Sequence, residues 1–259
     1  MRRRRHYATT GNRAYLRTSA ATASPAELFH TDPALGDARS EQSQQLIMGG
    51  IARVCDREVE FTMEVVASAP IEQIDIWDGL NLIETVRPYH DADLGRCLRL
   101  VYEGAEYRGR ARTTTWDGSL TIRGNRIQRT AVINSWNLDR GIQKQDAASV
   151  TWKAVTTGNY GAIDLWLEQP GTGRIAFKTQ PVAGEIDISS LGLAPRIFEA
   201  GGLERRVKLQ RLPDTMSQTR MTLQRRVKLR LTGETRLYVR VQQEDGHRMW
   251  SSPIYLFRD

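Results

Sequence analysis

The chain has 259 residues, with 37 Lys and Arg against 30 Asp and Glu, so its formal net charge is +7. Hydrophobic residues make up 40% and charged residues 26%, which is the composition of a folded protein and argues against wholesale disorder. There is no apolar run of the length that a membrane-spanning helix needs, and 2 Cys and 4 His argue against a disulfide-dense scaffold or a four-thiolate metal site.

The chain begins with a basic segment that contains no acid. No apolar stretch follows Met1–Arg5, which excludes both a signal peptide and a twin-arginine export signal. We interpret this run as the last turn of a basic helix, with a short nucleic-acid-binding arm as the alternative. The run starts abruptly, as if an upstream domain were missing.

The next part of the chain predicts a strand and then a long connection. Residues 7–18 read as a strand with a turn at Thr10-Gly11-Asn12. Residues 19–45 are rich in Ala, Ser, Thr, Asp and Pro and show no sustained period. They therefore predict a long loop with one short helical turn near Pro25–Phe29.

A β region begins near Met48 and contains the clearest strand in the chain. Apolar side chains alternate with Glu and Thr from residue 58 to residue 65, which indicates a half-buried strand. Ile74 and Ile76, the turn Asp78-Gly79 and the return Leu82–Val86 predict a hairpin. Further strands are expected at 98–102 and 107–115.

From Trp116 onward, turn sequences recur at short intervals and no helical period is sustained. Residues 136–147 are polar and irregular and predict a loop. Regular short strands favour a sandwich or barrel over an α/β sheet. Strands are expected at 120–122, 130–133, 150–154, 163–167, 174–179 and 185–188.

A basic pentapeptide occurs twice, as Arg205–Leu209 and as Arg225–Leu229. Residues 205–230 hold nine Lys and Arg and one acid, so 9 − 1 gives +8. In the second copy the basic side chains and the apolar ones fall on opposite parities, as in a strand with one solvated face. This pattern favours solvated strand faces over a nucleic-acid groove. The chain then ends with alternating residues at 237–241, a turn at Asp245-Gly246 and a last strand at 254–257.

Several candidate sites have simpler structural interpretations. His90-Asp91-Ala92-Asp93 holds an imidazole and two carboxylates, but its flanking Pro and Gly indicate a loop, and a metal site is the weaker alternative. A hairpin turn explains His247 better than a catalytic base does. Gly171–Ala176 matches a relaxed dinucleotide fingerprint without the following helix, and predicts a hairpin turn. Neither a nucleophile elbow nor a P-loop is present.

The cysteines and tryptophans leave alternatives open. Cys55 and Cys97 are expected to be buried free thiols, and a disulfide requires their Cα atoms to lie within about 7 Å. The six Trp are expected to pack in or beside the β core, with a sugar-stacking platform as the alternative. They are Trp77, Trp116, Trp136, Trp152, Trp166 and Trp250.

Three stretches, taken in order, resemble one known family. They are 4–13 (RRHYATTGNR), 70–79 (PIEQIDIWDG) and 237–247 (LYVRVQQEDGH), the last running on through 250–255. Together they resemble the C-terminal part of an uncharacterised bacterial family related to the polymerase-and-histidinol-phosphatase (PHP) metal-dependent hydrolases and catalogued as a domain of unknown function. Residues 116–118 and 156–159 fit the same pattern.

The resemblance implies that the chemistry lies elsewhere. In that family a zinc- or manganese-type site of His, Asp and Glu belongs to an N-terminal barrel, and its ligand motifs lie upstream of the stretch that resembles Tyr7–Arg13. No position here matches a ligand motif, so the resemblance assigns no catalytic, cofactor-binding or metal-ligating residue to this chain. Tyr7, Thr9 and Thr10 would lie near the barrel in structural roles.

We therefore expect an all-β chain of two β-sandwich-like units, preceded by a short remnant of an α/β barrel. Residues 1–42 would be that remnant plus a loop, 43–115 with 226–259 an immunoglobulin-like sandwich, and 116–225 an inserted β domain. The expected function is that of a non-catalytic β-rich region of a truncated PHP-like hydrolase, with the barrel of the same protein as its partner. The alternative is a stand-alone carbohydrate- or polyanion-binding module.

Overall fold

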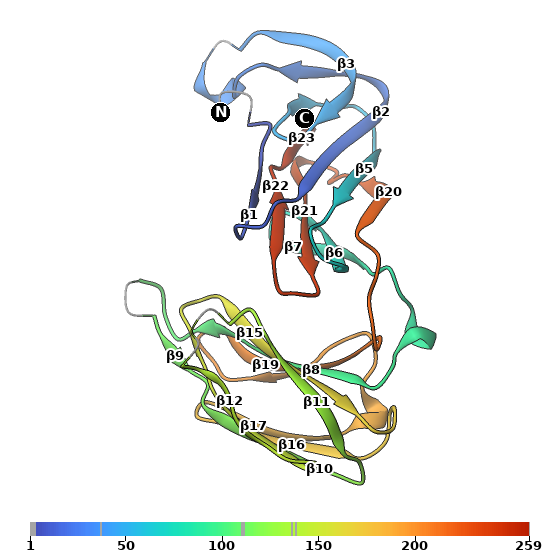
Figure 1. The fold of residues 1–259 in the computed structure, drawn as a ribbon. Helices are drawn as coiled ribbons and strands as arrows, with labels where there is room; N and C mark the ends of the chain where they lie inside the picture. The colour runs from blue at the N-terminus through green and yellow to red at the C-terminus, as the bar shows by residue number, and fades with distance from the viewer. Residues whose placement is uncertain (1–3, 37, 110–111, 136, 138, 259) are drawn as a thin grey trace. The chain divides into compact units, whose positions relative to one another are not determined.

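The computed structural model describes residues 4–258 except 37, 110, 111, 136 and 138, and within these it is built from strands (Figure 1). Among the residues described, the helical elements are the 3₁₀ turns at Pro33–Leu35, Asp91–Asp93 and Ile188–Ser190. None of the helical segments in this part of the chain has the length and apolar character needed to cross a membrane. The all-β prediction is confirmed. Residues 4–6 are not helical, and the rest of the helical turn expected at Met1–Arg5 falls outside the described residues.

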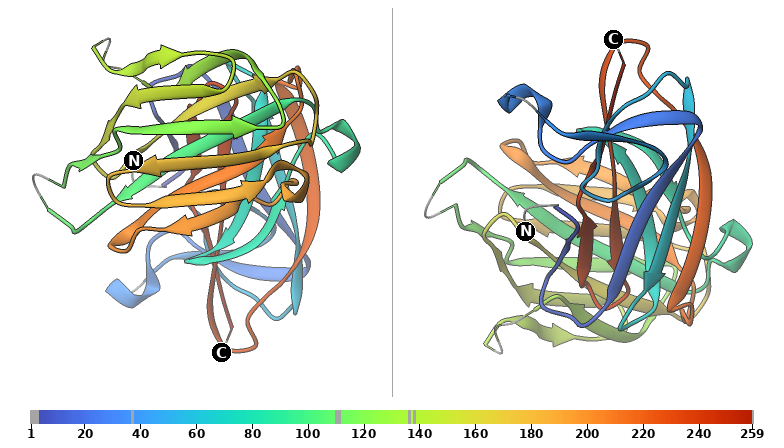
Figure 2. Two further views of the ribbon diagram at one scale, coloured as in Figure 1. Left: turned by 90° about the horizontal axis from the view of Figure 1, so that it is seen from below. Right: turned by 90° about the horizontal axis from the view of Figure 1, so that it is seen from above.

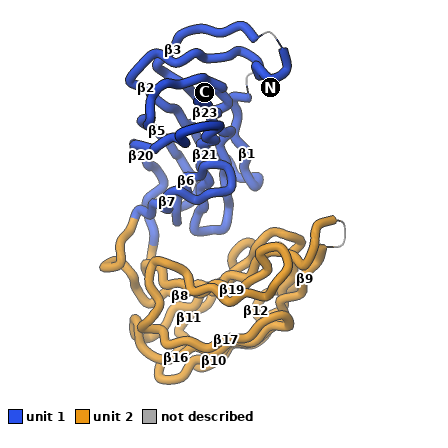
Figure 3. Tube along the Cα trace, turned by 180° about the vertical axis from the view of Figure 1, so that it is seen from behind, with its two compact units in different colours: residues 1–88, 216–259 blue, residues 89–215 orange. Residues whose placement is uncertain are grey.

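The chain divides into two compact units, and the second is inserted into the first (Figure 3). Unit 1 comprises residues 1–88 and 216–259, and unit 2 comprises residues 89–215. Each unit has its own hydrophobic core, as expected when each supplies enough apolar side chains to fold around.

Unit 1 contains one eleven-stranded sheet, in which the described strands pair antiparallel except β23 and β4, which are parallel. Its main path runs β1-β22-β21-β23-β4-β2-β5-β20, with β3 on β2 and the β6–β7 hairpin on β21. The strands are β1 (Tyr7–Thr9), β2 (Tyr15–Phe29), β3 (Ser40–Ile47), β4 (Ile51–Arg53), β5 (Glu58–Val66), β6 (Ile71–Asp78), β7 (Asn81–Val86), β20 (Arg220–Lys228), β21 (Gly233–Gln243), β22 (Arg248–Ser251) and β23 (Ile254–Arg258).

The core of unit 1 forms between distant parts of this sheet. Phe61 and Met63 on β5 and Val239 and Val241 on β21 are fully buried and belong to one cluster. Because β23, β4 and β2 separate these strands along the sheet, the sheet must fold over its own core. The alternation predicted for residues 58–65 is confirmed, since β5 buries every second side chain.

Unit 2 contains two five-stranded sheets and a two-stranded ribbon of β9 and β14. One sheet has the order β12-β13-β10-β16-β17 and is seen face-on in the left view of Figure 2; the other has the order β11-β15-β8-β19-β18. The strands are β8 (Cys97–Ala105), β9 (Thr114–Thr115), β10 (Gly118–Arg123), β11 (Ile127–Ile133), β12 (Gly141–Gln145), β13 (Ser149–Lys153), β14 (Val155–Thr156), β15 (Tyr160–Leu167), β16 (Arg174–Thr179), β17 (Ala183–Asp187), β18 (Arg196–Glu199) and β19 (Leu203–Leu212).

The two sheets of unit 2 share one core, to which Leu100 and Leu165 contribute from one sheet and Leu120 and Ile175 from the other. A buried ion pair lies elsewhere on the second sheet. Arg99 Nε and Nη2 each donate to one carboxylate oxygen of Asp164 on the neighbouring strand β15, both at 2.7 Å. Such bidentate pairing satisfies both charges where little water reaches them.

Two of the predicted loops contain strands, and one predicted strand is shorter than expected. Residues 19–45 hold most of β2 and β3, and 136–147 contain β12. In β2 the buried positions include Thr18, Ala20 and Thr22, so the alternation exists but hydropathy does not reveal it. Conversely, the strand predicted at 107–115 is reduced to Thr114–Thr115 among its described residues.

The domain boundaries differ from the predicted ones. The inserted unit begins at Tyr89 rather than at 116 and ends at Thr215 rather than at 225. The reason is strand pairing: β8 was expected in the first domain, but it pairs with β15 and β19 of the insertion. Residues 1–42 do not form a separate segment, because β1, β2 and the start of β3 belong to the sheet of unit 1.

Candidate functional site: a polar network on four neighbouring strands

The three stretches that carry the family resemblance come together in unit 1. They supply β1, β6, β21 and β22, which lie side by side in the sheet. One row of paired residues crosses all four strands: Ala8 faces Trp250, Trp250 faces Arg240, and Arg240 faces Asp75. Segments more than 150 residues apart in the chain are thus neighbours.

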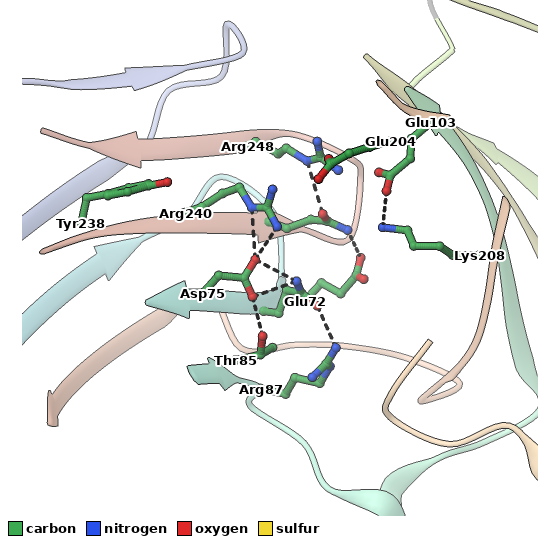
Figure 4. A network of polar contacts seen from close by, with 12 residues as sticks. Glu72, Asp75, Thr85, Arg87, Glu103, Glu204, Lys208, Tyr238, Arg240 and Arg248 are labelled. Atoms are coloured by element: carbon green, nitrogen blue, oxygen red, sulfur yellow. Dashed lines mark hydrogen bonds and ion pairs between the residues drawn. The ribbon is translucent and has the colours of Figure 1, made fainter. Parts of the chain in front are cut away.

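Asp75 is the centre of the network (Figure 4). Its side chain is 2% exposed, and its carboxylate accepts hydrogen bonds from Arg240 Nη2 at 2.7 Å, Thr85 Oγ1 at 2.7 Å and Gln73 Nε2 at 3.1 Å. Arg87 Nη2 in turn donates to Gln73 Oε1 at 2.9 Å. Because side chains from three strands donate to it, this carboxylate is suited to fixing the register of these strands.

An aromatic pair lies beside the charged pair. The rings of Trp77 and Tyr238 stack with centroids 6.3 Å apart and planes 13° apart. The Arg240 guanidinium lies 5.2 Å from the Trp77 ring centroid, so it contacts both Asp75 and an aromatic face. Tyr238 Oη donates to Gly79 O at 3.0 Å. Burial raises the pKa of Tyr238, with Arg240 opposing and Asp75 adding to this effect.

The first stretch is tied to the third by hydroxyl contacts. Thr10 Oγ1 accepts from the Arg248 backbone N–H at 3.0 Å and lies 2.9 Å from His247 Nδ1. Because a hydroxyl can donate and accept at the same time, it can make both contacts together. His247 therefore packs against β1 at the end of the β21–β22 hairpin, which agrees with the hairpin-turn interpretation.

Buried amides extend the network toward the second stretch. Gln243 is completely buried, and its Oε1 accepts from Ser68 Oγ at 3.1 Å and from the Ala69 N–H at 2.9 Å. Ser68 Oγ also accepts from Asn12 Nδ2 at 3.1 Å. One glutamine thus connects the Thr10–Asn12 turn to the segment that enters β6.

The sequence did not single out Gln243 or Asp75 as candidate residues. Both occupy the family-like stretches, but a polar residue in a strand looks like a solvated one when its partner is unknown. The one available signal was Gln242-Gln243 where the alternation of β21 should have continued, and a register irregularity lies between these two residues.

The His90–Asp93 segment forms a 3₁₀ turn. Asp93 Oδ2 accepts from the His90 backbone N–H at 2.8 Å, so this carboxylate caps the turn as the loop interpretation requires. Within the described part of the chain, no three His, Cys, Asp or Glu side chains are grouped as metal ligands.

The described tryptophans and cysteines lie in different environments of the chain. Trp116 and Trp152 are in the core of unit 2, and Arg129 stacks on Trp166 at 3.7 Å, while Trp136 falls outside the described residues. Cys97 is buried and Cys55 exposed, and both are free thiols, so the expectation that both are buried is wrong for Cys55.

The turn at 171–174 connects two sheets. Gly171 and Gly173 have positive φ values of 68° and 92°, as a tight turn requires, and β16 rather than a helix follows. The predicted turn is confirmed, but it is not a hairpin, because β15 and β16 belong to different sheets of unit 2.

Comparison with known proteins adds no relative. The chain matches no protein-family model. Neither the curated proteins nor the solved structures contain a match to it.

Proposed function

We propose that this chain is the non-catalytic β-rich region of a PHP-like metal-dependent hydrolase and packs on the catalytic barrel of that protein. The observation that carries the proposal is the convergence of the three family-like stretches on β1, β22, β21 and β6. The contacts of Asp75, Thr10 and Gln243 also join these stretches, as expected of segments that serve one structural unit.

The finer architecture belongs to the same proposal. Unit 1 would be an immunoglobulin-like sandwich, which is supported by the core that β5 and β21 share. Unit 2 would be a second sandwich, supported by the single core between its two five-stranded sheets. In this proposal the polar network on β6 and β21 holds these strands of the unit 1 sheet in place. The barrel contacts the same sheet at a neighbouring strand.

The contact with the barrel would be at β1. This strand is at the end of the sheet's main path, and its described residues pair only with β22. Thr10 N–H donates to Arg248 O, and His6 O accepts from Ser252 N–H, so residues of even number face β22. By the alternation of an antiparallel pair, the backbone groups of Tyr7 and Thr9 point to the open edge. A segment of the barrel would pair there.

The parentage is tested by the sequence encoded immediately upstream of Met1. We expect an in-frame barrel rich in His and Asp. An unrelated upstream gene that ends in its own stop codon would contradict the proposal.

Residue-resolved hydrogen exchange tests the contact itself. In the whole protein the amides of Tyr7 and Thr9 should be protected, whereas in this chain alone they should exchange freely. The Thr10 amide, which donates to Arg248 O at 3.1 Å, is the internal control and should be protected in both. Equal exchange of Thr9 in the two proteins would exclude β1 as the contact.

A further inference from the structure

Unit 2 contains a cavity lined mainly by polar residues, all of which lie outside the three family-like stretches of unit 1. Its volume is about 280 Å³, just below the roughly 300–1,000 Å³ of pockets for drug-sized ligands. That size suits a ligand of about one ring. The cavity is formed at one end of the two sheets: Lys153 ends β13, whereas Tyr102, Tyr160 and Gly161 belong to β8 and β15.

The rim of the cavity is positively charged. Gly141 pairs with Lys153 across β12 and β13, which brings Arg140 next to Lys153. Both side chains line the cavity, both residues are exposed, and neither makes an ion pair with the described residues. No Asp or Glu is among the described residues that line the cavity. Two adjacent cations without a carboxylate favour an anionic group in this position.

Neutral hydrogen-bonding groups form the remaining wall. Asn134 has a positive φ of 55° and its Nδ2 donates to Tyr160 O at 2.6 Å, which fixes the amide against the start of β15. Ser135, Asn137, Thr113 and Thr157 add hydroxyl and amide groups to the lining. Such a set recognises hydroxyl groups, because each member can donate and accept.

Among the lining residues, Tyr102 most clearly favours a ligand with hydrogen-bonding groups. Tyr102 is only 4% exposed, and the centroid of its ring lies 6.0 Å from that of Trp116 in the core. Its hydroxyl has no hydrogen-bond partner among the described residues, although it lines the cavity. Burial raises the pKa of Tyr102 to about 12, so the hydroxyl keeps its proton at neutral pH. Although the ring is buried, the hydroxyl oxygen itself is accessible, so it can donate to and accept from a group that enters the cavity.

Gly161 makes room for this hydroxyl. Gly161 and Tyr102 are paired residues of β15 and β8. A Cβ at Gly161 would lie 2.7 Å from Tyr102 Oη and 2.6 Å from its Cε2, closer than atoms can approach. The absence of a side chain at 161 therefore lets the Tyr102 hydroxyl lie at the floor of the cavity.

We propose that this cavity binds an anionic monosaccharide, with its carboxylate or phosphate at Arg140 and Lys153 and its hydroxyls at Tyr102 and Asn134. The ligand class follows from the size of the cavity, its charge and its donors. This site is independent of the proposed barrel contact on β1, so either proposal can fail alone.

Ligand-observed NMR titration of the full chain tests the proposal with glucuronate, glucose 6-phosphate, glucose and inorganic phosphate. We expect at least one of the two acidic sugars to bind at least tenfold more tightly than glucose and than phosphate, and to weaken as salt is raised. Preference for glucuronate or for glucose 6-phosphate identifies the anionic group. Glucose binding as tightly as both acidic sugars, phosphate alone binding, or no binding by either acidic sugar would overturn the proposal.

Three variants separate a built site from general charge attraction. Tyr102→Phe removes only the hydroxyl and should weaken the acidic sugar about fivefold or more without lowering the melting temperature, because the ring packing is kept. Lys153→Gln should weaken it about tenfold, whereas Lys178→Gln, at an exposed lysine of β16 outside the cavity, should not. Unchanged affinity in both Tyr102→Phe and Lys153→Gln would overturn the proposal.

Discussion

Asp75 shows how one buried charge can organise a sheet. Taking a carboxylate out of water is expensive unless its charge and lone pairs are matched. Here the Asp75 carboxylate accepts hydrogen bonds from Arg240 on β21, Thr85 on β7 and Gln73 on its own strand, β6. A shift of register by one residue would turn Asp75 toward the apolar core, so the ion pair disfavours alternative pairings of β6 and β21.

Asp75→Ala should therefore lower the free energy of unfolding by about 2–4 kcal/mol, because Arg240 would be left partly buried without its counter-ion. Urea denaturation gives this difference. The control is Glu234→Ala, which removes an exposed pair with Arg236 at 3.6 Å and should change stability by less than about 0.5 kcal/mol. Equal effects of the two substitutions would show that the buried pair does not stabilise the sheet.

At this scale the sequence predicts apolar burial better than polar burial. The positions of Phe61 and Met63 follow from alternation alone, since no partner needs to be known. Asp75 and Gln243 could not be recognised, because their burial depends on Arg240 and Ser68, which are far away in the chain. The polar network is consequently the part of the candidate site that only the structure reveals.

The repeated pentapeptide shows the same sequence in two environments. In β19, Val207 and Leu209 are fully buried. On the opposite face Lys208 Nζ contacts Glu103 Oε1 at 2.9 Å (Figure 4). Arg206 Nε contacts the same oxygen at 2.9 Å. In β20, Val227 is buried in the same way, but the matching Lys228 is exposed. The apolar face is thus common to both copies, whereas the charged face makes short contacts in unit 2 and, in unit 1, an exposed contact of Arg226 Nη1 with Glu58 Oε1 at 3.9 Å.

Lys208→Gln should lower stability by about 1–2 kcal/mol, since it removes a charge-assisted hydrogen bond to a partly buried Glu103. Lys228→Gln is the matched control from the other copy and should change stability by less than about 0.5 kcal/mol. Chemical denaturation of both variants measures the two effects. A Lys228→Gln effect as large as that of Lys208→Gln would contradict this account.

Glu103 also gives unit 2 a predictable response to acid. Burial alone would raise the pKa of Glu103, but Lys208 and Arg206 outweigh it and hold the pKa below its ordinary value of 4.5. A carboxyl with a lowered folded-state pKa stabilises the fold above its unfolded pKa and loses that contribution as the pH falls. The stability difference between the unchanged chain and Glu103→Gln should therefore be constant from pH 7 to about 5 and shrink below about 4.5. A stability difference between the two proteins that stays constant from pH 7 to pH 3 would contradict this role of Glu103.

Elements with apolar alternation were predictable, and those with small residues were not. The β6–β7 hairpin was expected from Ile74, Ile76 and the Asp78-Gly79 turn and is confirmed. β2 was missed because small and hydroxyl-bearing residues such as Ala20 and Thr22 occupy buried positions. Its strand conformation follows from pairing with β3, β4 and β5, which is a tertiary effect that local propensity does not contain.

The insertion of unit 2 explains why both halves of unit 1 are needed. β5 and β20 pair along their whole length although 153 residues separate Val66 from Arg220 (220 − 66 − 1). Unit 2 occupies most of that interval and has its own core between two sheets. An inserted unit with its own core should fold independently.

Residues 89–215 expressed alone should therefore unfold in a single cooperative transition in urea, with well-dispersed amide resonances before it. Residues 1–88 expressed alone should not, because β5 would lack β20 and β6 would lack β21. A non-cooperative 89–215 fragment would show that its core does not suffice.

The nested organisation was predictable, but its boundaries were not. The predicted boundary at Trp116 rested on turn sequences that become more frequent there, but this change in turn frequency lies within unit 2. The true boundaries at Tyr89 and Thr215 separate strands of similar composition, and only the pairing of β8 with β19 assigns them. Since pairing between distant strands leaves no local trace, sequence alone could not place them.

The central claim is that this chain accompanies a catalytic barrel without carrying out its chemistry. The most direct test is the metal content and phosphoester hydrolysis of the purified chain after incubation with zinc or manganese and removal of the excess. The account predicts much less than one bound metal per chain and no turnover of p-nitrophenyl phosphate above the blank. One tightly bound metal per chain with turnover that a chelator abolishes would contradict it.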